Sequence, residues 1–335
     1  MKKKMLSAVL AAAMMTVLAA CGGSKPAETT AAPAAAAETK AEETKAEEKK
    51  EETKAEETKA EETKAEEAKA EETKAEAKAP ADLKTVAPGK LTVGTSPDFA
   101  PYEFYHVDET GTPQLSGFDI SLAKRIAEDL GLELQIVPMD FDGILMELQN
   151  GNIDLGISGF SPSPERAEVF DFSDIYYLGG QSFCVKKDNL EKYKSYEDFK
   201  GLPVGAQNGS IQYGLAEKNT PDANIIGLAK VTDIVSELVT GKLEGAFIET
   251  AVAEQYAKNY PDLCIAWEVP YDSEGSAIAI QKGNEEMLKA VNEIVANVKA
   301  DGSMDKYVTE AGDLASDEGN VYQGMLDENG NVKQQ

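Results

Sequence analysis

The sequence predicts an α/β fold from about residue 86 onward, because short β-favouring runs alternate there with amphipathic helical patterns. Residues 90–94 (KLTVG) form the first predicted strand, and residues 134–137 and 153–157 form two more. Each gap between these strands has room for one helix. The three strands and two helices therefore form consecutive βαβ units.

Capping signals mark the two helices. Asp119 is expected to cap the first helix, which ends at Gly131, and Asp142 is expected to cap the second, which ends at Gly151. The apolar face of the first helix consists of Ile120, Ala123, Ile126, Ala127 and Leu130.

The N-terminus carries a secretory pattern. Three lysines precede an apolar run over residues 5–20 that is too short to cross a bilayer comfortably. The run ends in residues 18–22 (LAACG), which resemble a bacterial lipobox. We therefore expect a signal peptide over residues 1–20 and a lipid anchor on Cys21. An ordinary secretory signal followed by an incidental cysteine is the alternative.

Residues 21–85 have the composition of a tether. The pentad EETKA recurs from Glu42 onward, and a five-residue period gives no continuous apolar stripe on a helix. We expect a disordered or partly helical spacer between membrane and folded domain. Its helicity stays open, and binding of a partner by the repeats is the alternative.

The whole chain is strongly acidic, with 33 basic and 60 acidic residues and a net charge of -27. Most of this excess lies beyond Thr85. Such a charge repels nucleic acid and anionic lipid, so we expect no nucleic-acid partner and attribute the charge to solubility.

Cysteine content excludes a disulfide framework, since only Cys184 and Cys264 remain after Cys21. Two free thiols and one disulfide both fit the spacing. The region of about 250 residues is long enough to bury a core without covalent staples.

No catalytic, metal or cofactor site is expected. His106 lies in a predicted surface loop without a cysteine or second histidine that would suggest zinc. Trp267 lies in a β-favouring run and is expected to pack in the core. The chain contains no nucleophile elbow, Walker loop or dinucleotide fingerprint, which disfavours an enzyme.

Residues 158–166 (SGFSPSPER) suit the binding of a zwitterion. They run from a strand end through a loop into a helix with Ser163 as cap and Pro164 as first residue. Such a loop offers carbonyls, a hydroxyl and amides, and Arg166 can bind a carboxylate with two hydrogen bonds. Alternatively, Arg166 pairs with a neighbouring acidic residue on the surface.

A second strand, loop and helix occupy residues 203–212, after a helix expected to be capped by Ser195. Amides at the start of the second helix can bind an anion.

Residues 90–325 resemble the bacterial extracellular solute-binding proteins of family 3, the amino-acid receptors of ABC importers. The resemblance is collinear and rests on residues 91–95, 101–104, 117–120, 154–159, 164–166, 171–174 and 305–307.

The resemblance implies a type II periplasmic-binding-protein-like clamp. In this α/β fold each lobe is a mixed sheet flanked by helices, and two crossing strands form the hinge. We expect lobe 1 over residues 86–180 plus 277–335 and lobe 2 over residues 181–276. The implied function is capture of a free amino acid between the lobes and delivery to a membrane permease. The protein is expected to be monomeric and lipid-anchored outside the cytoplasm, at the cell surface or in a periplasm.

The resemblance also assigns the ligand contacts. Arg166 is expected to bind the α-carboxylate with the amides of Ser161 and Ile211. The Gly159 carbonyl, the Ser161 hydroxyl and Glu249 are expected to accept from the α-ammonium group. The family often has aspartate where this chain has Glu249, and Glu249 could instead cap the following helix.

Selectivity is expected to arise from the first loop, an aromatic wall and a second-lobe loop. Receptors for basic side chains often carry an acid at the position of Ser96, although Asp98 is close by. No basic residue replaces Gln207 to hold a second carboxylate. We therefore expect a neutral polar or apolar ligand held against Phe99 and Phe141. The selectivity residues are Ser96, Phe99, Tyr102, Phe141, Gln207 and Gln212.

Two other classes of function stay open. The fold also hosts a cyclohexadienyl dehydratase, for which Glu249 or Asp98 is the candidate general acid. A ligand-sensing module is the third possibility.

Overall fold

The computed structural model describes residues 83–273, 275–316 and 321–322. The predicted signal peptide, the lipid anchor on Cys21 and nearly all of the predicted tether lie outside these residues. Within the described ranges, no helix is both long enough and apolar enough to span a bilayer.

The first sheet consists, in spatial order, of β5 (Glu133–Pro138), β1 (Lys90–Thr95), β6 (Leu155–Gly156), β13 (Ala279–Gln281) and β7 (Phe170–Phe172). Strand β1 is parallel to β5 and β6, whereas β13 is antiparallel to β6 and β7. The sheet is therefore mixed.

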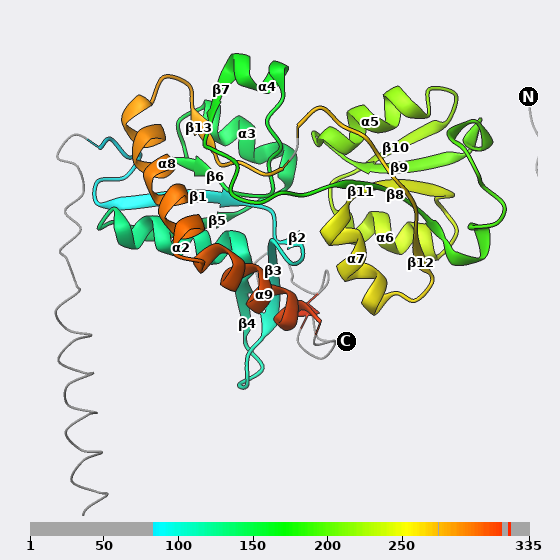
Figure 1. Ribbon diagram of the computed structural model, residues 1–335, viewed down its shortest axis with the longest axis horizontal. Coiled ribbons are helices and arrows are strands. Elements are labelled where there is room, and N and C mark those ends of the chain that lie inside the picture. Colours follow the sequence, from blue (N-terminus) through cyan, green and yellow to red (C-terminus); the bar gives the residue numbers. More distant parts are fainter. Residues whose placement is uncertain (1–82, 274, 317–320, 323–335) are drawn as a thin grey trace, which may run out of the picture. The chain divides into compact units, whose positions relative to one another are not determined.

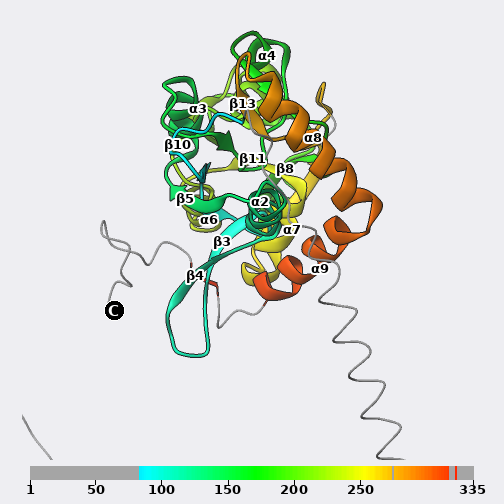
Figure 2. The same cartoon turned by 90° about the vertical axis from the view of Figure 1, so that its left-hand side faces the viewer.

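Helices cover both faces of the first sheet, as Figures 1 and 2 show. Helices α2 (Phe118–Asp129) and α8 (Glu285–Ala300) pack on one face and α3 (Phe141–Gln149) on the other. Helix α4 (Pro164–Val169) contacts β7, and α9 (Ser303–Ala315) packs on α2, α8 and β3. Leu91 and Val93 of β1 face a core shared with α2, α8 and α9, whereas Ile144 of α3 packs in a separate cluster with Phe160. Successive residues of β13, Ala279 and Ile280, belong to the two different clusters, as expected of side chains that alternate between the faces of a strand.

The second sheet consists, in spatial order, of β10 (Asn224–Leu228), β9 (Pro203–Gln207), β11 (Gly245–Glu249), β8 (Gln181–Lys186) and β12 (Leu263–Glu268). Its first three strands are parallel, and β8 is antiparallel to both β11 and β12. Its helices are α5 (Ile211–Asn219), α6 (Val231–Val239) and α7 (Thr250–Asn259), with the 3₁₀ turns η1 (Lys187–Asn189) and η2 (Tyr196–Phe199).

Aromatic packing fixes one face of the second sheet. Phe183 of β8 stacks on Trp267 at a centroid distance of 4.9 Å and meets Phe199 edge-on at 4.8 Å. The expected packing role of Trp267 is confirmed. Cys184 and Cys264 lie on adjacent strands and are both free thiols, which decides the question left open by their spacing.

A small third sheet consists of β14 (Val321–Tyr322), β3 (Glu103–Val107) and β2 (Asp98–Phe99), with β4 (Pro113–Ser116) paired to β3. The hairpin of β3 and β4 extends outward from α2 (Figures 1 and 2). His106 lies in β3 and pairs with Gln114 and Val321, so its assignment to a loop was wrong. Cross-strand pairing overrides the polar local sequence.

The chain crosses twice between the two large sheets, once between β7 and β8 and once between β12 and β13. We call the first sheet with its helices and the small sheet lobe 1, and the second sheet with its helices lobe 2. The predicted α/β class, with a mixed sheet in each lobe, is confirmed.

Two predicted helix caps are wrong. The N-cap residues of α2 and α3 are Gly117 and Asp140, and neither helix has a side-chain cap. The Asp119 carboxylate points into lobe 1 and is buried. In contrast, Ser163 caps α4 as predicted, and Ser195 forms a capping box with the turn η2.

Replacement of Gly117 by alanine tests the junction that brings Asp119 and Tyr102 together. Gly117 has φ of 121°, and an added Cβ would lie 1.9 Å from the Tyr102 carbonyl oxygen. We expect Gly117→Ala to lower the free energy of unfolding by about 3 kcal/mol or more. Gly214→Ala is the control, because this α5 glycine has open space around it and should gain about 0.5–1 kcal/mol. Equal urea midpoints for the two variants would contradict this role of Gly117.

Candidate functional site

The predicted site residues lie where strands of both large sheets end. Ser96 follows β1, and residues 157–161 follow β6 in lobe 1. Gln207 ends β9 and Glu249 ends β11 in lobe 2. The carboxyl ends of strands are where open α/β sheets bind ligands. The fold therefore places these four segments where side chains and free backbone groups can meet a ligand.

Arg166 joins the two lobes through carbonyl groups. Its Nη1 donates to the Ser161 carbonyl at 2.8 Å, and its Nη2 donates to the Gly209 carbonyl of lobe 2 at 2.9 Å. The guanidinium lies 5.9 Å from the ring centroid of Phe141 and 5.7 Å from that of Phe160. Burial lowers the pKa of Arg166 to about 10. Arg166 makes no ion pair within the described part of the chain, so the alternative of a surface pair is wrong.

Glu249 is buried in lobe 2, with only 4% of its surface exposed. Its Oε2 accepts from the Val252 amide at 2.9 Å, and its Oε1 accepts from the Gly180 amide at 3.3 Å. The first bond caps α7, as the alternative interpretation of Glu249 proposed. Burial raises the pKa of Glu249 to about 7, against the opposing effect of these hydrogen bonds.

The crossing segment approaches Glu249 closely because it contains glycine. A Cβ added to Gly179 would lie 2.7 Å from Glu249 Oε1 and 3.0 Å from the Tyr102 hydroxyl. The Tyr271 hydroxyl donates to the Gly179 carbonyl at 2.9 Å. The Glu249 carboxyl group is thus fixed against the hinge and beside a tyrosine of lobe 1.

Aromatic residues of lobe 1 surround the loop after β6. The rings of Phe99 and Tyr102 lie 5.1 Å apart, and a Cβ on Gly159 would come within 2.9 Å of the Phe99 ring. Phe141 stacks on Phe160 at 4.7 Å. The predicted residues Phe99, Tyr102 and Gly159 are therefore brought together, and Phe141 joins Arg166 on the other side of the same loop.

The predicted glutamines of lobe 2 bond to neighbours in their own lobe. Gln212 Nε2 donates to Gln181 Oε1 at 2.8 Å, and Gln207 Nε2 donates to the Ala229 carbonyl at 3.0 Å. Ile211 is the first residue of α5, which Ser210 caps. Gln181 is buried and was missed from sequence, because one glutamine at a strand start carries no motif.

Asp98 makes a contact between the lobes that sequence reasoning did not assign. Its Oδ1 accepts from the Ser96 hydroxyl at 2.8 Å, and its Oδ2 accepts from the Val231 amide of lobe 2 at 2.5 Å. The Tyr256 hydroxyl of α7 donates to the Asp98 carbonyl at 2.9 Å. Burial raises the pKa of Asp98 to about 6. Its position two residues from Ser96 was the available signal.

Arg166 and Glu249 form no ion pair with each other, and both are held by neutral backbone groups. A guanidinium has five donors, so Arg166 keeps three for an anion. A cation near Glu249 would stabilise its ionised form. The arrangement therefore suits a ligand that carries one charge of each sign.

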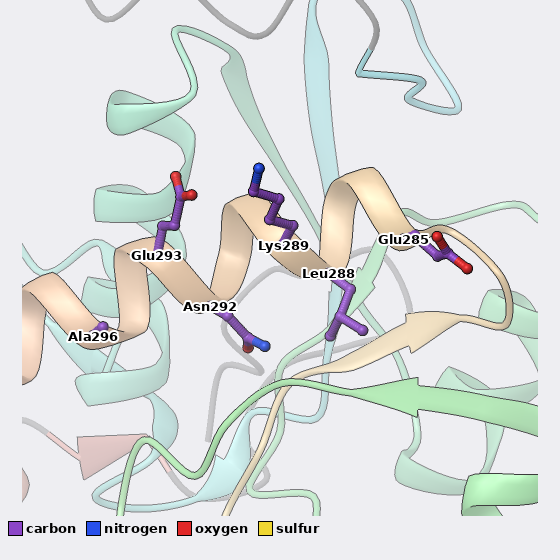
Figure 3. Close-up of a pocket in the computed structure, with 6 residues that line it drawn as sticks. All are labelled: Glu285, Leu288, Lys289, Asn292, Glu293 and Ala296. Carbon is purple, nitrogen blue, oxygen red and sulfur yellow. The ribbon is translucent and has the colours of Figure 1, made fainter.

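Neither a metal centre nor the pocket on α8 competes with this site in the described part of the chain. No cluster of histidine, cysteine or carboxylate residues in the described part of the chain could hold a metal ion. The pocket in Figure 3 is lined by residues of α8 alone, and Lys289 and Glu293 point to one side of the helix while Leu288 and Asn292 point to the other. Polar groups do not converge there, as a ligand site requires.

Residues 91–311 match the family model of the bacterial extracellular solute-binding proteins, family 3. The chain belongs to this family. Among its relatives, the arginine-binding extracellular protein ArtP of Bacillus subtilis is 34% identical over 221 residues, which cover 65% of this chain and 84% of ArtP.

Solved structures confirm the predicted clamp fold. The substrate-binding protein AbpA of Streptococcus pneumoniae, bound to L-arginine, is 37% identical with a TM-score of 0.66, over 68% of this chain and 97% of AbpA. The ancestral amino-acid-binding protein AncCDT-1, a precursor of cyclohexadienyl dehydratase, is 37% identical with a TM-score of 0.60, over 66% of this chain and 95% of its own. The fold is thus that of two-lobe, type II amino-acid-binding proteins.

Proposed function

We propose that this protein captures a free α-amino acid between its two lobes and delivers it to the permease of an ABC importer. The observation that carries the proposal is a partly buried guanidinium and a buried carboxyl group, at the strand ends of different lobes, neither paired with an opposite charge. The α-carboxylate would bind Arg166 and the α-ammonium group would bind Glu249, with the Gly159 carbonyl and the Ser161 hydroxyl. Membership of the family supports this function and supports a location of the protein outside the cytoplasm.

The lipid anchor is part of the same proposal. The lipobox-like segment at Cys21 would attach the protein to the membrane, and residues 21–85 would hold lobes 1 and 2 near the permease. Lobe 1 would span residues 86–180 plus 277–335, and lobe 2 residues 181–276. A single chain supplies both halves of the site, which is consistent with a monomer.

We propose a ligand with a neutral polar or apolar side chain. Both carboxylate oxygens of Asp98 already accept a hydrogen bond, from Ser96 and Val231, and only 9% of the residue is exposed, so Asp98 offers little accessible surface to a guanidinium. The pKa of Asp98, raised to about 6, also fits a carboxyl group without a cationic partner. Arginine is the second candidate, because ArtP is named for binding it and AbpA was solved with it.

A dehydratase of the cyclohexadienyl type is the competing function, favoured by the likeness to AncCDT-1. The raised pKa values of Glu249 and Asp98 would suit a general acid. However, Glu249 accepts hydrogen bonds that fix the start of α7 and the crossing segment, and Asp98 accepts one from the opposite lobe, so both groups have a structural role. The relatives named as binding proteins support the absence of catalysis. Turnover of a cyclohexadienyl acid by the purified protein would favour the enzyme.

A thermal-shift screen of the full chain against the common L-amino acids tests the proposed ligand class. A ligand that binds only the folded state raises the melting temperature in proportion to the logarithm of its concentration over Kd. We expect the largest rise with a neutral amino acid. A larger rise with arginine would overturn the side-chain proposal and leave the function intact. No rise with any amino acid would contradict the function itself.

Removal of the guanidinium should nearly abolish binding. In Arg166→Ala the ligand carboxylate would be desolvated without its charge partner, at a cost of about 3–5 kcal/mol, or at least roughly a hundredfold in Kd. Titration calorimetry measures the change. Arg125→Ala is the matched control, because Arg125 pairs with Asp129 and Asp301 on the surface and should leave Kd unchanged. Equal affinity of Arg166→Ala and the wild type would refute the carboxylate assignment.

Binding should strengthen as the pH rises through about 7, the pKa to which burial raises Glu249. Below this pH Glu249 is protonated and attracts the ammonium group weakly; above it the carboxylate is charged. We expect Kd to fall up to about tenfold per pH unit below 7 and this effect of Glu249 to be complete about one pH unit above it. Glu249→Gln should bind more weakly, with an intact fold and without this pH dependence.

Glu249→Asp provides the control for the pH experiment, because it keeps the charge on a shorter side chain. It should retain the pH dependence whatever its absolute affinity. Identical pH profiles of Glu249→Gln and the wild type would show that the ammonium group is held elsewhere.

A further inference from the structure

Two buried carboxyl groups lie beside the loop that follows β6. Glu103 of β3 and Asp119 of α2 are each 0% exposed, and neither belongs to the predicted ligand contacts. A carboxylate removed from water requires a cation, a set of donors or a proton. The neighbours of the two groups show which of these each one has.

Glu103 accepts a hydrogen bond from Ser158, the second residue of the loop. The Ser158 hydroxyl donates to Glu103 Oε1, and Ser158 Oγ accepts from the Ser96 amide at 3.2 Å. A single chain of bonds therefore connects β3, the end of β6 and the segment after β1. Ser96 is itself one of the residues expected to face the ligand side chain.

Asp119 holds the next residue of the same loop. The Gly159 amide donates to Asp119 Oδ2 at 2.9 Å, and the Tyr176 hydroxyl donates to the same oxygen at 3.0 Å. The two carboxyl groups thus fix two successive residues, Ser158 and Gly159. The carbonyl of Gly159 is a proposed acceptor for the ligand ammonium group.

The remaining oxygens of the pair lack donors. Glu103 Oε2 and Asp119 Oδ1 are buried and accept no hydrogen bond, yet the two groups are within hydrogen-bonding reach of each other. Facing them are Asp98 of β2, which adds negative charge, and the neutral hydroxyl of Tyr176. Neither carboxyl group forms an ion pair within the described part of the chain. Two buried carboxylates this close would repel each other, and a proton shared between their free oxygens would remove that repulsion and satisfy both.

We propose that Glu103 and Asp119 share one proton, and that this protonated pair positions the Ser158–Gly159 segment to accept the ligand ammonium group. The proposal rests on the proposed function as an amino-acid receptor. Both residues are positioning residues, since they act on the ligand through the backbone of the loop. Their electrostatics agree: burial, and then the charge of Asp119, hold the pKa of Glu103 well above its ordinary value, and burial raises the pKa of Asp119.

Loss of the shared proton should weaken binding and stability as the pH rises. Because burial raises the pKa values of the pair in the folded protein, the stability that the shared proton contributes is full below the unfolded-state values of about 4 and is lost as the pH rises through the folded-state values. Two adjacent buried charges would then repel each other and displace Ser158 and Gly159. Affinity and thermal stability should both decline on the alkaline side.

The Glu103→Gln variant distinguishes a shared proton from a role of Glu103 in packing alone. The amide oxygen can still accept from Ser158, and the amide NH₂ replaces the shared proton as a permanent donor to Asp119. We expect Kd for L-glutamine and for L-arginine at pH 7 within about threefold of the wild type. Between pH 7 and pH 10, the wild-type affinity should fall at least about tenfold relative to the variant at the same pH. This ratio cancels the titration of the ligand and of Glu249.

A second experiment measures thermal stability and needs no ligand. From pH 6 to pH 10, the melting temperature of the unliganded wild type should fall relative to that of Glu103→Gln. If the wild type binds no amino acid, the proposed function fails, and this arm still decides the shared proton. Parallel pH profiles of wild type and variant in both arms would overturn the shared proton.

Two further variants complete the test. Asp119→Asn is the reciprocal replacement and should behave like Glu103→Gln; a loss of affinity above about tenfold at pH 7 in both variants would overturn the proposal. Asp154→Asn is the control for damage to lobe 1. Asp154 is a buried carboxylate that accepts from the Val86 and Thr92 amides, each at 2.7 Å, away from the loop. It should lower stability without changing the ratio of affinities across pH.

Discussion

The Arg166 guanidinium and the Glu249 carboxyl group are held by backbone dipoles instead of opposite charges, and the rest of the site depends on this arrangement. Carbonyls of Ser161 and Gly209 accept from Arg166, and amides of Val252 and Gly180 donate to Glu249. Dipoles fix the geometry of a charge without neutralising it. The lowered pKa of Arg166 and the raised pKa of Glu249 express the same lack of a counter-charge. A zwitterion supplies both missing charges at once.

The same groups connect ligand binding to the hydrogen bonds that join the two lobes. Arg166 belongs to lobe 1 but reaches a carbonyl of lobe 2, and Glu249 belongs to lobe 2 but bonds to the crossing segment at Gly180. Asp98 adds a third contact, to the first turn of α6. A ligand that binds Arg166 and Glu249 therefore acts on residues that already hold the lobes together, which is how differential contacts shift a two-state equilibrium.

Acidic groups without cations recur around the site. Asp98, Glu103, Asp119 and Glu249 are all buried, and burial raises the pKa of each. Their partners are amides, hydroxyls or one another. In the proposed roles, Glu249 loses its proton to attract an ammonium group, whereas the pair of Glu103 and Asp119 keeps one to hold the loop, so affinity should respond to pH in both directions. Binding is expected to be strongest between these two limits.

The sequence by itself determined the α/β class, the strands that begin at Lys90 and Pro203, the Ser163 cap, and the candidacy of Arg166 and Glu249. The class, the strands and the cap depend on local periodicity and capping chemistry, whereas the role of Glu249 was implied by the resemblance to the family. Only the tertiary structure decided that Asp119 turns inward to Gly159 instead of capping α2, that His106 lies in a strand, that the two cysteines are free, and that Asp98 bonds to Val231. The physical reason is sequence separation: these contacts join residues brought together by strand order and by the two crossings, and no local pattern encodes which distant donor a buried carboxylate will find.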